Sequence, residues 1–241
     1  MGRALDTLIA AWQETPWKPG VRNVLAGDEA ALSRNAVAIS SWDDFCRNSE
    51  FEPELFHTHL MPMPWVGNLR TAKVFLLQLN PGVGAHDYFG EHRVPEYLAM
   101  LEANLKQRAD HAFPFLGPEF GWHGGANYWQ PKLKRVVESL DGDWRRVAAG
   151  IAVLELVPYH SRVFARNDRW LGGLESTRLM QAFVREEVLP DHRANRRAVI
   201  LLRAHARWGV DELDKPEPGR ARGATLSETD LQRIVETLKR S

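Results

Sequence analysis

Three short runs of apolar residues divide the chain and predict buried β-strands. They span residues 74–79, 151–157 and 198–202, and each is apolar at nearly every position. Runs of this length that end at proline or at polar residues are typical of strands covered on both faces. Longer stretches separate them, as the connections between parallel strands require. We therefore expect a central, mostly parallel sheet.

Helical patterns fill much of the remaining chain. The expected helices cover residues 5–12, 29–38, 95–108, 131–140, 175–189 and 228–239, with a further short one after Ser41. Ser41 and Ser227 are expected as N-caps, and Pro190 as a helix stop. The alternation predicts a three-layer α/β/α sandwich in a single domain, residues 1–241. Within it, residues 1–70 form a helical and irregular N-terminal part, and residues 71–241 form the core.

The composition removes several classes of protein. Lysine plus arginine and aspartate plus glutamate number 31 each, so there is no global basic excess of the kind found in many nucleic-acid binders. The single cysteine, Cys46, excludes an internal disulfide, a cysteine-rich zinc site and a four-cysteine iron–sulfur cluster. We expect it to be a small buried apolar residue. The N-terminus is too polar for a signal peptide or a membrane span, which predicts a cytoplasmic protein. No cofactor, metal or membrane partner is expected.

Polar residues follow each of the three expected strands. The first run ends at Asn80, and the next residue, Pro81, lacks a backbone donor and cannot continue an interior strand. The carboxyl ends of parallel strands share one edge, and open α/β sheets place their ligand crevices there. The residues expected at this edge are Asn80, Tyr159, His160, Arg203 and His205.

The segment after the first strand carries a dense set of polar and aromatic side chains. His86, Asp87, Tyr88 and Phe89 are expected on a loop that leaves the sheet. Residues 111–130 are rich in glycine, proline and aromatic residues, so we expect them to be irregular. Such a loop either packs over the core as a lid or offers flat faces for stacking.

Positive charge is concentrated around the second and third strands. A local basic band beside a neutral remainder suits a phosphate backbone lying across the strand ends. DNA, single- or double-stranded, is the expected partner, and no obligatory protein partner is evident. The arginines assigned to phosphate contacts are Arg162, Arg203, Arg207, Arg220 and Arg222.

Three segments together resemble the uracil-DNA glycosylase superfamily. Residues 73–82, KVFLLQLNPG, followed by Asp87-Tyr88-Phe89, resemble its first motif, a hydrophobic strand ending in Gly-x-Asn-Pro-Gly or Gly-Gln-Asp-Pro-Tyr. Residues 198–210, AVILLRAHARWGV, resemble its later strand. Residues 151–161, IAVLELVPYHS, occupy the place of its middle strand, whose end supplies the group that reads the base edge. The resemblance implies a uracil-DNA glycosylase-like fold.

It also implies a monofunctional DNA N-glycosylase, which hydrolyses the N-glycosidic bond of a flipped-out uracil-like or modified base. The process served would be base excision repair, or antiviral defence against bacteriophage DNA that carries modified bases. Asn80 would orient the attacking water, and His160 would donate a hydrogen bond to the leaving base. The residues assigned to the base pocket are Pro81, Gly82, Asp87, Tyr88, Phe89, Tyr159 and His205.

Two departures from that superfamily keep other functions open. Gln78 and Leu79 stand where glycine is often seen, and the closing His-Pro-Ser motif is absent. One alternative is a nucleic-acid-binding α/β domain without catalysis. The other is an unrelated hydrolase that uses a serine nucleophile, or a metal held by two imidazoles on one face of a strand. Its residues would be Ser161 with His160, or His57 with His59.

Overall fold

The computed structural model places four strands of the described chain in one sheet. It describes residues 2–13, 17–48, 50–108, 111–164, 171–203, 205–210, 213 and 225–240. The strands are β1 (Trp65–Val66), β2 (Val74–Gln78), β3 (Ile151–Glu155) and β4 (Ala198–Leu201). Their order across the sheet is β1-β3-β2-β4, with β2 parallel to β3 and to β4, and β1 antiparallel to β3. The expected mostly parallel sheet is confirmed, with β2 inside it.

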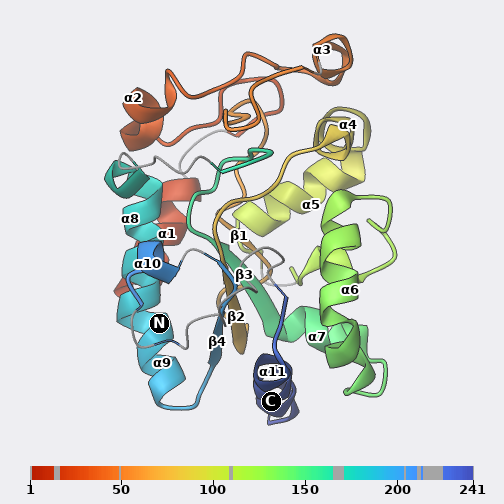
Figure 1. Ribbon diagram of the computed structural model, residues 1–241, viewed down its shortest axis with the longest axis vertical. Coiled ribbons are helices and arrows are strands. Elements are labelled where there is room, and N and C mark those ends of the chain that lie inside the picture. The colour runs from red at the N-terminus through yellow and green to blue at the C-terminus, as the bar shows by residue number, and fades with distance from the viewer. Residues whose placement is uncertain are drawn as a thin grey trace.

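Helices lie on both sides of this sheet (Figure 1). In chain order they are α1 (Arg3–Gln13), α2 (Glu29–Leu32), α3 (Trp42–Arg47), α4 (Ala85–Arg93), α5 (Pro95–Leu105), α6 (Gly124–Glu138), α7 (Trp144–Gly150), α8 (Glu175–Phe183), α9 (Leu189–Arg193), α10 (His205–Trp208) and α11 (Glu228–Lys239). Short 3₁₀ turns are η1 (Ala26–Asp28), η2 (Pro114–Leu116) and η3 (Leu171–Gly173), and η4 (Val184–Val188) is π-helical. In Figure 1, α1, α8 and α9 lie on one side of the sheet and α6 and α7 on the other, as an α/β sandwich requires.

The three parallel strands are buried because they are apolar on both faces. Every residue of β2, β3 and β4 is buried. In register, Gln78 lies opposite Glu155, and Leu77 lies opposite Leu201. All three strands therefore end at the same edge of the sheet, as expected from the sequence.

Two expected helix starts are confirmed by their caps. The hydroxyl of Ser41 accepts the backbone N–H of Asp44 at 3.0 Å, and that of Ser227 accepts the N–H of Asp230 at 3.1 Å. The Asp230 carboxylate in turn accepts the backbone N–H of Ser227 at 2.9 Å. These bonds satisfy backbone donors that have no partner within the helix.

Two segments expected to be irregular are partly helical. Residues 87–89 lie in α4 and not on a loop, because the Asp87 carboxylate caps the backbone N–H of Gly84 at 2.7 Å. The aromatic stretch 111–130 contains the start of α6, where His123 is the N-cap. Pro131 lies inside α6 and not at a helix start.

Three further expectations are corrected. The helix expected at 29–38 ends at Leu32. Pro190 does not stop the chain's helical path, which continues from α8 through the π-helical η4 into α9; Pro190 lies in α9 directly after this π-helical segment. Cys46 is exposed and not buried. Among the described residues, no helix is both long and apolar enough to cross a membrane.

The sheet edge next to β1 generates a prediction about Gly67. This residue has φ +101°, and an added Cβ would lie 2.6 Å from the carbonyl oxygen of Ile151. Gly142 also has positive φ, +77°, but no atom within 4 Å of the added Cβ. Gly142→Ala should lower the free energy of unfolding by about 1–2 kcal/mol from backbone strain alone. Gly67→Ala should lower it by roughly 1–3 kcal/mol more, because the strand backbone must also move. Urea unfolding measures both, and equal losses would contradict the close packing at Gly67.

Candidate functional site

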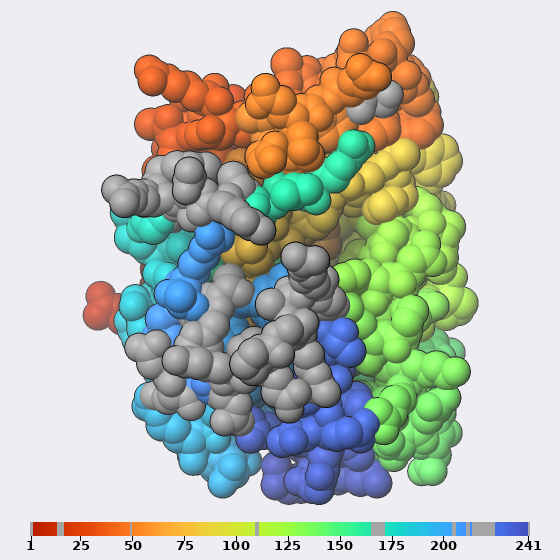
Figure 2. Space-filling model, in the orientation of Figure 1, coloured from red at the N-terminus to blue at the C-terminus, as the bar shows by residue number. Residues whose placement is uncertain are grey.

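Asn80 lies just beyond the inner strand β2, and the next residue, Pro81, has no backbone N–H with which to continue the hydrogen bonds of the sheet. Peptide groups of this segment pair instead with the segment after β3. The N–H of Val157 donates to the carbonyl of Leu79 at 2.9 Å, and that of Ser161 donates to the carbonyl of Pro81 at 3.2 Å. The two strand ends are thereby joined beyond the sheet. In Figure 2 the segment after β3 lies at the surface, between the N-terminal part and the residues that follow β2.

Three oxygen atoms surround the Nδ2 atom of Asn80. They are the Ser161 hydroxyl at 2.9 Å, the Pro81 carbonyl at 3.1 Å and the Tyr159 carbonyl at 3.4 Å. Carbonyl oxygens only accept, so the amide can have only this orientation. No described residue donates a hydrogen bond to Oδ1, and the side chain is only partly buried. Asn80 therefore offers one fixed acceptor at the strand end.

His160 lies between two backbone carbonyls. Its Nδ1 is 2.7 Å from the carbonyl oxygen of Gly82, and its Nε2 is 3.2 Å from that of Met61. The residue is only 2% exposed. The ring therefore braces the loop after β2 and does not face solvent. This placement does not support the expected bond from His160 to a departing base.

The aromatic residues of the expected pocket differ in exposure. Tyr88 is fully buried, and its hydroxyl bonds to the carbonyl of Ile39 at 3.1 Å and contacts Nδ1 of His57 at 2.9 Å. Tyr159 is also buried, and its hydroxyl donates to Asp28 at 2.7 Å. The expectation that these two rings contact a base is corrected, because they are core residues. Phe89, in contrast, is 40% exposed on α4.

A buried carboxylate and two imidazoles form a cluster that sequence reasoning did not assemble. The Oδ2 atom of Asp87 accepts the Gly84 N–H at 2.7 Å and lies 3.2 Å from Nε2 of His86. Its Oδ1 atom lies 3.3 Å from Nε2 of His123, a contact without the alignment of a full hydrogen bond. Asp87 and His86 come from α4, whereas His123 precedes α6. The cluster therefore ties two helices together.

Asp87 stays ionised although it is buried. Burial acts to raise its pKa, but the N–H of His123 and the nearby imidazoles of His160, His123 and His86 lower that pKa to about 2. Burial lowers the pKa of His86, and the charge of Asp87 only partly opposes this effect. At neutral pH, an uncharged His86 therefore faces a charged carboxylate.

The ligand atoms of His86, Asp87 and His123 lie within 4.8 Å of one another, close enough to hold a metal ion. However, Nδ1 of His123 accepts the N–H of Gly125 at 2.9 Å. Its proton must then sit on Nε2, the atom that faces Asp87. A metal needs a lone pair there, and a metal-bound histidine donates its other N–H outward. The cluster therefore suits proton chemistry better than metal binding. In the described chain, His57 and His59 belong to no such group.

The last residues of β2 and β3 form a second polar pair. Gln78 donates to the Tyr128 hydroxyl at 3.0 Å, and Oε2 of Glu155 has no partner among the described residues. Burial raises the pKa of Glu155 to about 8, while Arg203 acts to lower it. Glu155 is therefore a neutral acid at pH 7. The sequence contained a signal for this pair, because each is the one polar residue of its apolar run.

Three of the expected phosphate-binding arginines belong to the described surface. Arg162 and Arg203 are exposed, and Arg207 is partly exposed. The Arg162 guanidinium lies 4.5 Å from the ring centre of Phe51. They follow β3 and β4 in the chain and so lie beyond the carboxyl ends of those strands. Outside the described part are Arg220, Arg222 and the side chain of His205.

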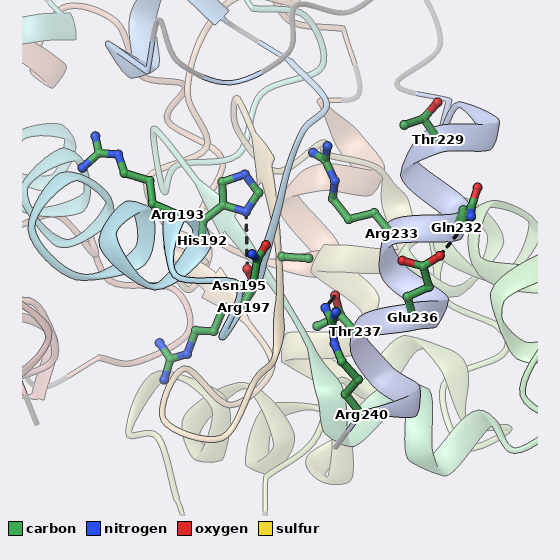
Figure 3. Close-up of a pocket in the computed structure, with 11 residues that line it drawn as sticks. His192, Arg193, Asn195, Arg197, Thr229, Gln232, Arg233, Glu236, Thr237 and Arg240 are labelled. Carbon is green, nitrogen blue, oxygen red and sulfur yellow. Dashed lines mark hydrogen bonds between the residues drawn. The ribbon is translucent and has the colours of Figure 1, made fainter.

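A separate pocket of about 480 Å³ opens between α11 and the connection from α9 to β4 (Figure 3). Ala198, the first residue of β4, forms part of its wall. In its lining, Arg197 pairs with Asp191 at 3.3 Å and Arg240 donates to Thr237 at 3.3 Å. The pocket lies at the amino end of β4, so it is distinct from the Asn80 site.

Comparison of the chain with protein-family models, with curated proteins and with solved structures finds no match. The assignment of a function to this chain therefore rests on the geometry around Asn80 and on the cluster of His86, Asp87 and His123.

Proposed function

We propose that this protein is a DNA glycosylase of the uracil-DNA glycosylase type. It hydrolyses the bond between deoxyribose and a flipped-out uracil-like or modified base, in repair or in defence against foreign DNA. The observation that carries the proposal is the fixed amide of Asn80, with its Oδ1 atom open at the end of the inner strand.

The chemistry of base release matches what Asn80 offers. Cleavage of an N-glycosidic bond passes through an oxocarbenium-like state, in which the base departs while water approaches the sugar. Oδ1 of Asn80 would accept a hydrogen bond from that water and so fix the orientation of the water. An amide is no strong base, which suits a reaction driven mainly by departure of the base.

The sheet topology supports a site at this position. The chain leaves β2 for β3 on one side and later reaches β4 on the other side of β2. Open α/β sheets bind their ligands outside the carboxyl ends of the strands, where the connections diverge. Asn80 lies at that end of β2.

Surface groups near α4 suit a nucleotide. Phe89 and Trp122 are 40% and 41% exposed, and their ring centres lie 5.9 Å apart. Flat bases stack on exposed aromatic rings of this kind. Arg162 and Arg203 would contact phosphates, which hold the DNA without reading its sequence.

Replacing Asn80 by alanine should stop base release and leave DNA binding unchanged, because the water loses its acceptor. We expect kcat to fall about 10²–10³-fold. The assay incubates single- and double-stranded DNAs that carry uracil or other modified bases, and detects free base by mass spectrometry and abasic sites by alkaline cleavage. Asn127→Ala is the matched control, since Asn127 is exposed on α6. Full activity in folded Asn80→Ala would remove Asn80 from the mechanism. DNA binding by the wild-type protein without release of any base would favour the non-catalytic alternative.

Asn80→Asp should also be inactive, although a carboxylate is the stronger base. One carboxylate oxygen would have to face the three oxygens that now surround Nδ2. We expect the free energy of unfolding to fall by roughly 1–3 kcal/mol, because polar groups of the loop lose their donor. Urea unfolding and the base-release assay test this together. A faster Asp variant would show that the amide is not held as described.

Arg203→Ala should weaken DNA binding uniformly across sequences and reduce the salt dependence of binding by about one phosphate contact. Fluorescence anisotropy at several salt concentrations measures both effects. Arg185→Ala is the control, since Arg185 is exposed in η4 and belongs to another part of the fold. An unchanged salt slope in Arg203→Ala would exclude a phosphate contact at this residue.

A further inference from the structure

A backbone hydrogen bond to His123 and the charge of Asp87 together favour one arrangement of protons in the cluster of His86, Asp87 and His123. The N–H of Gly125 donates to Nδ1 of His123, which leaves the proton of that ring on Nε2, 3.3 Å from Asp87. Nε2 of His86 lies 3.2 Å from the same carboxylate, a contact without the alignment of a hydrogen bond, and the negative charge of Asp87 favours the proton of His86 on that nitrogen. The lone pair of His86 is therefore on Nδ1. No described residue donates to that atom.

Two glycines make room for the His86 ring. A Cβ atom at Gly84 or at Gly124 would clash with the ring of His86. Gly84 has φ −153°, an extended conformation open to any residue, so its backbone conformation does not require glycine. Glycine is required there because a side chain would clash with the imidazole of His86. His86 is also half-buried, so its ring is held on several sides and still reaches solvent.

Helix capping explains only part of the cluster. Asp87 caps α4 by accepting the N–H of Gly84 on its Oδ2 atom. Capping of this kind does not require the imidazole of His86 or that of His123. The pairing of a carboxylate with a half-exposed histidine is the arrangement by which enzymes hold a general base in one tautomer.

We propose that His86 is the proton-transfer residue of the Asn80 site, with Asp87 and His123 as positioning residues. The inference rests on the proposed glycosylase function. The oxygen of the attacking water bonds to C1′ of the sugar, and its proton goes to Nδ1 of His86. The electron pair of the C1′–N bond leaves with the base. The imidazolium, stabilised by Asp87, then returns the proton to the released base.

The position and charge of His86 suit this role. His86 lies in the first turn of α4, six residues after Asn80. It is electrostatically coupled to His160, whose ring bonds to the loop between them. The charged or titratable groups that face it are Asp87, His123 and His160, and burial is the largest influence, lowering the pKa of His86 below its usual 6.5. His86 is therefore an unprotonated acceptor at neutral pH.

The first test is the pH profile of base release. His86→Gln should lower kcat about 10²-fold or more and leave the Kd for DNA unchanged. In the wild-type protein, kcat should fall as pH drops through the lowered pKa of His86, and this acid limb should be absent from the variant. His92→Gln is the matched control, since His92 lies on the same helix and is partly buried outside the cluster. Unchanged kcat in His86→Gln would overturn the inference.

The same test distinguishes failure of the proposed glycosylase function from failure of the role of His86. If the protein is not a glycosylase, the wild-type protein releases no base from any DNA. Failure of the present inference leaves base release intact in both the wild-type protein and His86→Gln.

The second test needs no substrate. Nitrogen-15 NMR of the imidazoles should show His86 and His123 as Nε2–H tautomers, with His86 titrating below pH 6.5. Asp87→Asn should reduce the share of that tautomer in His86, because the carboxylate acceptor is lost. A predominant Nδ1–H tautomer in either ring would overturn the inference. So would Zn²⁺ binding at micromolar concentration with conversion of His123 to the Nδ1–H form, which would identify a metal site.

Discussion

The site depends on how the chain satisfies its backbone groups where β2 ends at Pro81. Proline offers no N–H, so the ladder to β3 cannot continue in its regular form. The carbonyls of Leu79 and Pro81 instead accept from residues after β3, and the same carbonyl of Pro81 also accepts from the side chain of Asn80. One backbone constraint thus joins two loops, orients the amide and leaves its oxygen open.

The histidines near this loop divide into supporting and open residues. Both ring nitrogens of His160 face carbonyl oxygens, and Nδ1 of His123 is occupied by a backbone N–H. Of the two imidazoles of the cluster, that of His123 is buried and that of His86 is half-exposed, and no described residue donates to Nδ1 of His86. An asparagine cannot take a proton from water, so the proposed reaction at Asn80 would pass the proton to a separate acceptor after the base departs. The structure supplies one candidate on the following helix.

The sequence was sufficient for the parts of the fold that depend on local pattern. Apolar runs of strand length define the parallel strands, and the Ser227 cap defines α11. It was insufficient where contacts join distant segments. Nothing around His123 indicates that it reaches Asp87, 36 residues earlier in the chain. The burial of Tyr88 depends on packing against the N-terminal part, which has no recognisable motif. The position of Asn80 beyond the end of β2 was predictable, because a strand end and a following proline are both local signals in the sequence.

Two buried carboxyl groups, that of Asp87 in α4 and that of Glu155 at the end of β3, show how environment gives similar side chains opposite charge states. Asp87 accepts a backbone N–H and lies close to the imidazoles of His86 and His123, which lower its pKa to about 2 despite burial. Glu155 has an oxygen without a partner among the described residues, and burial raises its pKa to about 8. At neutral pH the first can stabilise a cation, and the second can donate a hydrogen bond. Divergent pKa values of this kind, set by the environment of each carboxyl group, are how proteins assign acid and base roles to similar side chains. Both carboxyl groups are buried. The nearby donors keep Asp87 ionised, whereas their absence at Oε2 of Glu155, in the described part of the chain, keeps that group neutral.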